Sequence, residues 1–282
     1  MPEEAETMAS KTKRKVVLVI VEGSSDKTAL ELVLSRTFAP LDSTVTMVFV
    51  RGDITSDKNI HPANIVNRVT DVVKEYAQNN GKLHASDFLQ VIQITDTDGT
   101  YIPQGSVVKV AGITPDPFYT LTNIQTANLL GTVRRNTRKG NNINKLVSQN
   151  TVWRTIPYKL YYLSCNMEHA FHNQNNLDDE QKKALARQFQ RTYGRNVPSF
   201  YALLQSLLPP LPCQDYKTSW DYIRQGLHSL ERCSNLYLAL PANASQSGGV
   251  NAPQSGSSNA SQSGGATNDD ANAPQDAGDA TE

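Results

Sequence analysis

The sequence predicts an α/β protein whose parallel sheet is sandwiched by helices. Strand-like and helix-like segments alternate regularly from Lys15 to Asp98. A further strand-like run, KLYYLSCN, begins at Lys159, and segments of helical spacing follow it. Strands that alternate with helices are typical of right-handed crossovers between parallel strands. We therefore expect one parallel sheet of four or more strands with helices on both faces.

The elements of the alternating region can be placed from their residue patterns. Lys15 to Val21 is a continuous β-branched run that ends before a Glu-Gly pair, which is typical of a strand covered on both faces. The next segment has apolar residues at helical spacing, and Ser24, Ser25 or Asp26 can cap its start. By the same criteria we expect strands over residues 15–21, 44–52 and 88–99 and helices over residues 24–38 and 65–81.

Residues 99–150 interrupt this pattern. They mix Gly, Pro, Asn and Thr without strong periodicity, so we expect an insertion or a long flap. After this segment the sequence continues with the fourth strand and a helical C-terminal part over residues 176–233. Three helices are expected there, over residues 177–194, 197–208 and 219–233.

The two ends of the chain differ from the rest in composition. Residues 1–14 form a charged leader, and residues 241–282 contain no Lys, Arg, Leu, Ile or aromatic residue. Such a low-complexity tail lacks the apolar side chains that could offset its ordering entropy, so we expect it to be disordered. All 27 basic residues but only 22 of the 27 acidic ones lie in residues 1–240. The expected domain, residues 15–240, is therefore mildly basic, which permits nucleic-acid binding without requiring it.

Other classes of protein fit the sequence less well. No apolar run approaches the roughly 20 residues of a membrane helix, and no signal-peptide core follows the leader. We expect a soluble, cytoplasmic protein without a membrane partner. Cys165, Cys213 and Cys233 have neither the even count of a disulfide framework nor the spacing of a zinc site, so buried free thiols are expected.

Acidic residues follow two of the expected strands. Glu22 comes directly after the first strand, and Asp96 and Asp98 end the third. Because the carboxyl ends of parallel strands meet at one edge of a sheet, the three carboxylates are expected to face a common point. Their repulsion is costly unless a divalent cation neutralises it. Mg²⁺ is the natural candidate, with Mn²⁺ as a substitute.

These segments resemble a known family. VIVEGSSDKTAL and QVIQITDTDG are similar to the Toprim domain of topoisomerases, bacterial primases, small ribosomal RNA maturases and OLD-type nucleases. The resemblance covers residues 15–100. It implies that Asp96 and Asp98 hold Mg²⁺, that Glu22 is a general acid/base or a metal ligand, and that Asp26 stands near a possible second metal.

A second resemblance concerns the segment LSCNMEHAFHN. It is similar to the Ser-x-x-x-Glu and following His of the RloB-like branch of Toprim-related proteins, which accompany ATPases in bacterial defence loci. Ser164, Glu168 and His172 are the matching positions, although His169 is an alternative to His172 and the Phe and Trp that usually flank the Glu are absent. The resemblance implies a bacterial or phage defence context and a partner ATPase. The chain itself has no Walker A sequence.

Each candidate residue also has a structural interpretation. Asp-x-Asp-Gly is an ordinary turn sequence, and Glu168 and His172 can simply belong to a helix. A basic cluster lies within residues 99–150, and it can be a solvated loop or can hold a phosphate backbone: Arg134, Arg135, Arg138 and Lys139.

Two functions therefore remain open from the sequence. The first is Mg²⁺-dependent phosphodiester chemistry on DNA or RNA, most simply that of a Toprim-type nuclease, with Glu22, Asp96, Asp98, Glu168 and His172 as catalytic candidates. The alternative is a non-catalytic adaptor of the same fold that binds nucleic acid, a nucleotide or a partner ATPase. The expected domain is too short to include the gate domains of a topoisomerase. A replicative primase is disfavoured because no zinc-finger cysteines precede the Toprim-like segment.

Overall fold

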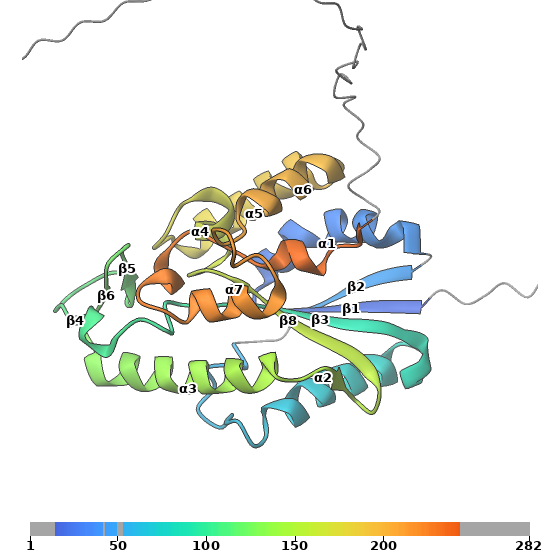
Figure 1. Ribbon diagram of the computed structural model, residues 1–282, viewed down its shortest axis with the longest axis horizontal. Coiled ribbons are helices and arrows are strands. Elements are labelled where there is room, and N and C mark those ends of the chain that lie inside the picture. Colours follow the sequence, from blue (N-terminus) through green and yellow to red (C-terminus); the bar gives the residue numbers. More distant parts are fainter. Residues whose placement is uncertain (1–14, 42, 50–52, 243–282) are drawn as a thin grey trace, which may run out of the picture. The chain divides into compact units, whose positions relative to one another are not determined.

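The expected strands form one sheet. A computed structural model describes residues 15–41, 43–49 and 53–242 (Figure 1). Its main sheet has the strand order β2-β1-β3-β8-β7. The first four of these strands are mutually parallel, and β7 pairs antiparallel with β8. The strands are β1 (Lys15–Val21), β2 (Ser43–Phe49), β3 (Phe88–Asp96), β7 (Thr151–Val152) and β8 (Ile156–Leu163).

Strand β1 shows why the sequence favours a sheet covered on both faces. Val17, Val19 and Val21 pack in one apolar cluster, and Leu18 and Ile20 pack in another on the opposite face. All of these side chains are buried. Alternate residues of a strand point to opposite faces, so a run without polar residues requires helices above and below the sheet.

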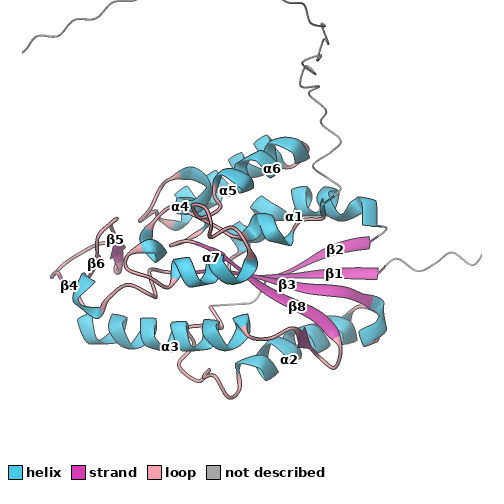
Figure 2. Cartoon of the chain, viewed as in Figure 1, coloured by secondary structure: helices cyan, strands magenta, loops and turns pink. Residues whose placement is uncertain are grey.

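Helices α1, α4, α5 and α6 cover one face of the sheet (Figure 2). Leu30, Leu34 and Phe38 bury the apolar side of α1 there. The start of this helix is fixed by Asp26, whose Oδ2 accepts the backbone N–H of Gly23 at 2.8 Å. The helices are α1 (Ser24–Phe38), α4 (Met167–His172), α5 (Asp179–Tyr193) and α6 (Val197–Ser206).

Helices α2, α3 and α7 pack with the opposite face. Val69 and Val73 of α2 and Ile143 of α3 belong to its apolar cluster, and Trp220 of α7 is fully buried beside Tyr162. The helices are α2 (Ile65–Asn79), α3 (Leu129–Val147) and α7 (Tyr216–Ile223). The predicted α/β sandwich is thus confirmed, with an antiparallel edge strand in addition.

Residues 99–150, which we expected to form an insertion or a long flap, contain regular secondary structure. The segment contains a second sheet, of three strands in the order β4-β6-β5, followed by the 19-residue helix α3. Hydrophobic periodicity could not reveal α3, because its buried residues include Asn136, Lys139, Gly140 and Asn142. The strands are β4 (Val107–Lys109), β5 (Phe118–Tyr119) and β6 (Ile124–Thr126).

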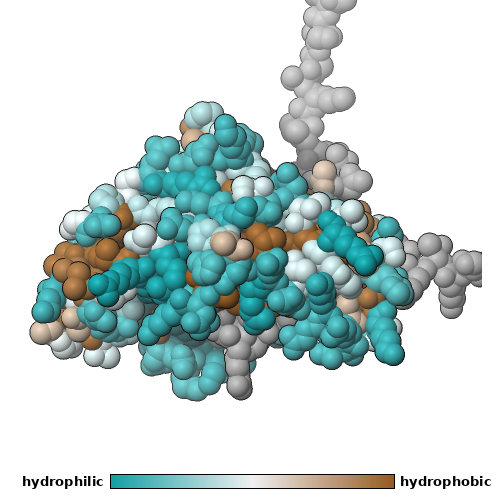
Figure 3. All heavy atoms as spheres, turned by 90° about the horizontal axis from the view of Figure 1, so that it is seen from below, coloured by the Kyte–Doolittle hydropathy of each residue, from teal (hydrophilic) through white to brown (hydrophobic). Residues whose placement is uncertain are grey.

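The small sheet lies at an apolar end of the molecule. Val108, Leu121 and Leu130 are among the exposed large hydrophobic residues. On the face that Figure 3 shows, hydrophobic residues gather at this end and hydrophilic residues cover most of the rest. The surface over helices α2 and α3 is therefore mainly polar.

The last expected helix is shorter than residues 219–233. Helix α7 ends at Ile223, and Gly226, with φ 51°, lies in the turn that follows. Residues 233–235 instead run beside β8, where Ser164 donates its backbone N–H to the Cys233 carbonyl at 2.9 Å. Short 3₁₀ turns complete the described chain, at Ala39–Leu41, Ala85–Asp87, Gln104–Ser106, His228–Leu230 and Leu236–Ala239.

The described chain ends just inside the expected tail. Tyr201 donates its hydroxyl hydrogen to the carbonyl of Pro241 at 2.8 Å, so Pro241 belongs to the folded part. The charged leader and residues 243–282 lie outside the described residues. The disorder expected for the tail therefore stays a prediction. The three cysteines are free, with Cys213 only half-buried. None of the described helices combines the length and apolar composition needed to cross a membrane.

Candidate active site

The three acidic residues singled out from the sequence meet at one edge of the sheet. Glu22 follows β1, Asp96 ends β3, and Asp98 lies in the turn after β3. The ammonium nitrogen of Lys139 lies 2.6 Å from Asp98 Oδ2 and 3.6 Å from Glu22 Oε2. Asp96 interacts electrostatically with both Glu22 and Asp98. The parallel topology therefore produces the predicted convergence of carboxylates.

The turn that carries Asp98 has a specific backbone conformation. Asp98 has φ 49°, and its N–H donates to the Cys165 carbonyl at 2.8 Å. Gly99 follows with φ 61°, and a Cβ there would lie 2.7 Å from Leu230 Cδ2 and 2.8 Å from Ile124 Cδ1. Only glycine fits this position without strain or a clash. The Asp-x-Asp-Gly sequence is thus a structural turn and also a means of placing two carboxylates.

Lys139 is the unexpected member of the site. Its side chain is fully buried, and it contacts Asp53 as well as Glu22 and Asp98. Burial alone would lower the pKa of Lys139, but the carboxylates of Asp53, Asp98 and Glu22 raise it well above its ordinary value. The prediction that Lys139 binds nucleic acid is wrong, because no part of this side chain reaches the surface.

Asp53 was not identified from the sequence. It comes shortly after β2, at the same sheet edge as the other acids, and its Oδ2 lies 2.5 Å from the Lys139 ammonium. Burial would raise the pKa of Asp53, but Lys139 and hydrogen bonds from Thr55 and Ser56 hold it well below the usual range. The criterion that found Glu22, an acidic residue after a strand, would also have found Asp53 if it had been applied to the second strand.

The carboxyl groups of Glu22 and Asp96 are the least compensated of the set. Burial, together with Asp53 and Asp98, raises the pKa of Glu22 well above its ordinary value in spite of Lys139 and of a 2.5 Å hydrogen bond from Thr95. Burial and the neighbouring Asp26, Glu22 and Asp98 raise the pKa of Asp96 in the same direction. Among the described residues, no side chain or backbone group donates a hydrogen bond to the Asp96 carboxylate.

Asp26 and Glu168 extend the acidic region behind Asp96. Burial and the nearby Glu168 raise the pKa of Asp26 to about 7, although the Gly23 N–H and Lys182 act in the opposite direction. Glu168, at the start of α4, is 4% exposed, and its burial raises its pKa. The structure thus places Glu168 close enough to Asp26 for the two carboxyl groups to interact electrostatically.

A small cavity gives access to Asp96 and Asp98. It has a volume of about 240 Å³ and lies between residues 115–119 and the segment that carries Asn166, Asn176 and Lys182. Two hydrogen bonds join these walls: Tyr119 donates its N–H to Asn176 Oδ1 at 2.7 Å, and Asn176 Nδ2 donates to the Tyr119 carbonyl at 2.8 Å. The carboxylates therefore face a bounded polar space.

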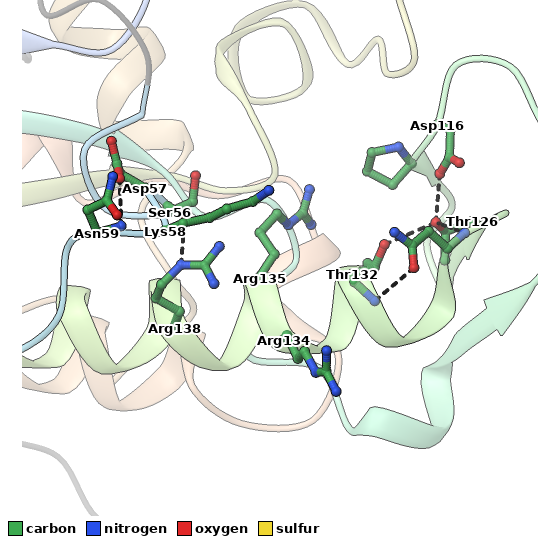
Figure 4. A pocket seen from close by; sticks show the side chains of 13 residues that line it. Ser56, Asp57, Lys58, Asn59, Asp116, Thr126, Thr132, Arg134, Arg135 and Arg138 are labelled. Atoms are coloured by element: carbon green, nitrogen blue, oxygen red, sulfur yellow. Dashed lines mark hydrogen bonds between the residues drawn. The ribbon is translucent and has the colours of Figure 1, made fainter.

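An open groove of about 940 Å³ adjoins this cavity. Asp116 and Pro117 line both. Three arginines of α3 and Lys58 of the facing loop provide its positive charge (Figure 4). Arg138 Nε donates to the Ser56 carbonyl at 2.8 Å, which joins the helix to that loop. The three arginines are the residues expected to bind nucleic acid, and here they belong to a helix and not to a loop: Arg134, Arg135 and Arg138.

Arg135 connects the groove with the acidic turn. Its guanidinium donates to the Asp98 carbonyl at 3.3 Å and to the Tyr119 hydroxyl at 3.1 Å. Arg134 is exposed on the same helix. A polyanion in the groove would therefore lie directly beside the carboxylates of the cavity.

The expected histidine does not line the acidic cavity. His172 packs edge-on against Phe189 with ring centroids 5.9 Å apart, and burial lowers its pKa. Its Nε2 has no hydrogen-bond partner in the described part of the chain. His169, the alternative position, is buried and lies 3.4 Å from the Ser164 carbonyl through Nδ1. Neither His169 nor His172 contacts the carboxylates of Glu22, Asp96 and Asp98.

The described residues contain no group of three or more His, Cys, Asp or Glu side chains arranged to hold a metal ion. Comparisons with known proteins add no assignment, since no family model, curated protein or solved structure matches the chain significantly. The site must therefore be interpreted from its own geometry.

Proposed function

We propose that this chain is a Mg²⁺-dependent enzyme that cleaves phosphodiester bonds of nucleic acid, in the manner of a Toprim-type nuclease. One observation supports this most strongly. The carboxylates of Glu22, Asp96 and Asp98 converge from two parallel strand ends, and an arginine-lined groove adjoins the cavity above them. This pairing of an acidic site with a basic groove suits a phosphate backbone that is held by cations and cut at a metal.

The donor set beside the cavity suits Mg²⁺. Asp96 and Asp98 line the cavity, and the carboxylate of Asp96 has no hydrogen-bond donor among the described residues. Mg²⁺ is usually held by one or two carboxylates, with waters and phosphate oxygens completing its coordination. Three convergent protein ligands are therefore not required. When bound, the ion supplies Lewis-acid polarisation of the scissile phosphate.

The protein groups divide the remaining tasks between them. Glu22 serves as general acid or base, and burial raises its pKa above the ordinary carboxyl value, which is the direction that such a role requires. Arg134 and Arg138 hold phosphates of the substrate in the groove. Arg135 fixes the groove to the Asp98 turn through the Asp98 carbonyl. Substrate phosphates are thus held next to the carboxylates.

A non-catalytic adaptor is the second candidate, and one observation favours it. Lys139 already neutralises part of the acidic cluster, so the fold does not depend on a metal for charge compensation. Such an adaptor would use the same groove to bind nucleic acid or a nucleotide. A partner ATPase, as in a bacterial defence system, would supply any ATP hydrolysis.

Cleavage of labelled DNA and RNA tests the proposal. The full chain is incubated with each substrate in Mg²⁺, Mn²⁺ or EDTA, alongside Glu22→Gln and the control Glu31→Gln, an exposed residue of α1 paired with Lys27. We expect metal-dependent cleavage that falls about 100-fold or more in Glu22→Gln, the usual scale for a lost general acid or base. The control should retain its activity. Binding of either nucleic acid without cleavage in any metal would favour the adaptor.

A further inference from the structure

Lys139 stands where carboxylates from three strand ends meet. It projects from α3, it is fully buried, and its ammonium contacts Asp53, Asp98 and Glu22 at 2.5, 2.6 and 3.6 Å. These acids follow β2, β3 and β1, the three neighbouring strands at that side of the sheet. An ammonium group has three donors and no acceptor, so it satisfies such a set as a compact positive charge.

The structure holds Lys139 in this position from both sides. Asp53 directs Oδ2 to the ammonium because its Oδ1 accepts the backbone N–H groups of Thr55 and Ser56, at 2.7 and 3.2 Å. Asn142, one turn along α3, donates Nδ2 to the carbonyls of Thr55 and Ile60 at 2.8 and 3.1 Å. Withdrawal of the lysine would therefore require helix and loop to separate.

The helix backbone also lies close to the acidic turn. A Cβ at Gly140 would lie 3.1 Å from Thr100 Cγ2, two residues after Asp98. The backbone of α3 next to Lys139 thus packs against the Thr100 side chain, directly after the Asp-x-Asp-Gly turn.

The two parts of the cluster are compensated differently. Lys139 lies against Glu22, Asp53 and Asp98, whereas Asp96 lines the cavity. Lys182 lines the same cavity, but none of the described cations is ion-paired with the Asp96 carboxylate.

We propose that the Lys139 ammonium is a resident cation between Glu22, Asp53 and Asp98, so that the site takes a single divalent ion, on the Asp96 side. The proposal rests on the proposed function for the ion at Asp96. Lys139 is a positioning residue in this arrangement: it fixes Glu22 and Asp98 and excludes a second ion from the space between them and Asp53.

Counting bound Mn²⁺ tests this. The full chain is titrated with Mn²⁺, and free ion is measured by electron paramagnetic resonance for wild type, Lys139→Met and Lys145→Met. Methionine retains the side-chain stem as far as the position of Cε and removes the ammonium group. Lys145, exposed near the end of α3, controls for the loss of one positive charge from the same helix. We expect one ion per wild-type chain, two per Lys139→Met chain and one per Lys145→Met chain.

The outcomes separate this inference from the proposed function. Two ions in wild type would overturn the inference, and so would an unchanged count in folded Lys139→Met. No ion in wild type but one in Lys139→Met would support the role of Lys139 and overturn the metal site at Asp96. No ion in either would overturn both. Lys139→Gln serves as the second variant if Lys139→Met does not fold, and two ions in wild type would overturn the inference without either variant.

Discussion

Removal of the Lys139 charge should destabilise the metal-free protein strongly. Loss of one partner of a buried ion pair costs about 3–5 kcal/mol, because the remaining charge is left uncompensated. Lys139 has no exposed surface and touches two carboxylates at 2.5 and 2.6 Å, so we assign Lys139→Met to this range. For a domain of this size, each kcal/mol lowers Tm by about 2–4 °C. The expected decrease is therefore about 6–20 °C.

The assay is thermal unfolding in EDTA at neutral pH, with Lys145→Met as the control. An exposed substitution of this kind usually changes stability by less than about 0.5 kcal/mol. The Lys139→Met deficit should shrink as the pH falls, because protonation of Glu22, whose pKa is raised in the folded protein, removes one of the crowded charges. Saturating Mn²⁺ should restore part of the lost stability by binding the folded state. A Lys139→Met protein that melts within about 2 °C of wild type in EDTA would refute the reasoning, given the scale above.

Three further predictions concern the surroundings of this cluster. The pKa of Asp26 is raised to about 7, above its unfolded value, so the stability that protonated Asp26 contributes is lost as pH rises from about 4 through 7. In chemical denaturation, the free energy of unfolding of Asp26→Asn should therefore decrease less over that range than that of wild type. A pH profile identical to that of wild type would contradict the shift. Arg134→Ala should weaken binding of single-stranded DNA, measured by fluorescence anisotropy. The slope of the logarithm of the binding constant against the logarithm of the salt concentration should fall in magnitude by about 1. The control variant Arg191→Ala, at an exposed position, should bind this DNA like wild type. Equal losses of affinity in the two variants would exclude the groove as the binding site. Gly99→Ala should lower the free energy of unfolding by more than about 1 kcal/mol, because Gly99 has a positive φ and close neighbours. The control Gly105→Ala, at a position with open space around it, should not. Similar melting curves for the two variants would contradict this prediction.

The sheet and its acidic edge could be predicted because their signals are local. A buried parallel strand needs an unbroken apolar run, as in β1, and an acid at the end of such a run has a place fixed by topology. Glu22, Asp96 and Asp98 satisfy both conditions, and the structure brings them together.

The remaining features depend on tertiary contacts that leave no periodic pattern. Helix α3 buries polar side chains against polar partners, as Asn142 does with the Thr55 and Ile60 carbonyls. Between residues 132 and 142 its buried side is therefore polar, which interrupts the apolar pattern of the helix. The burial of Lys139 has the same origin, since a lysine in a basic cluster looks like surface until Asp53 and Asp98 are placed around it. Asp53 could have been predicted, because it is an acidic residue that follows an expected strand, as Glu22 is.

The proposed function requires a divalent cation beside Asp96 at the carboxyl edge of the sheet. Anomalous scattering from a crystal soaked in Mn²⁺ tests it most directly, since the ion itself is located. The account predicts one Mn²⁺ peak per chain, within coordination distance of the Asp96 carboxylate and on the cavity side of Lys139. A site without a peak at Asp96, or with Mn²⁺ in the place of the Lys139 ammonium, would contradict it.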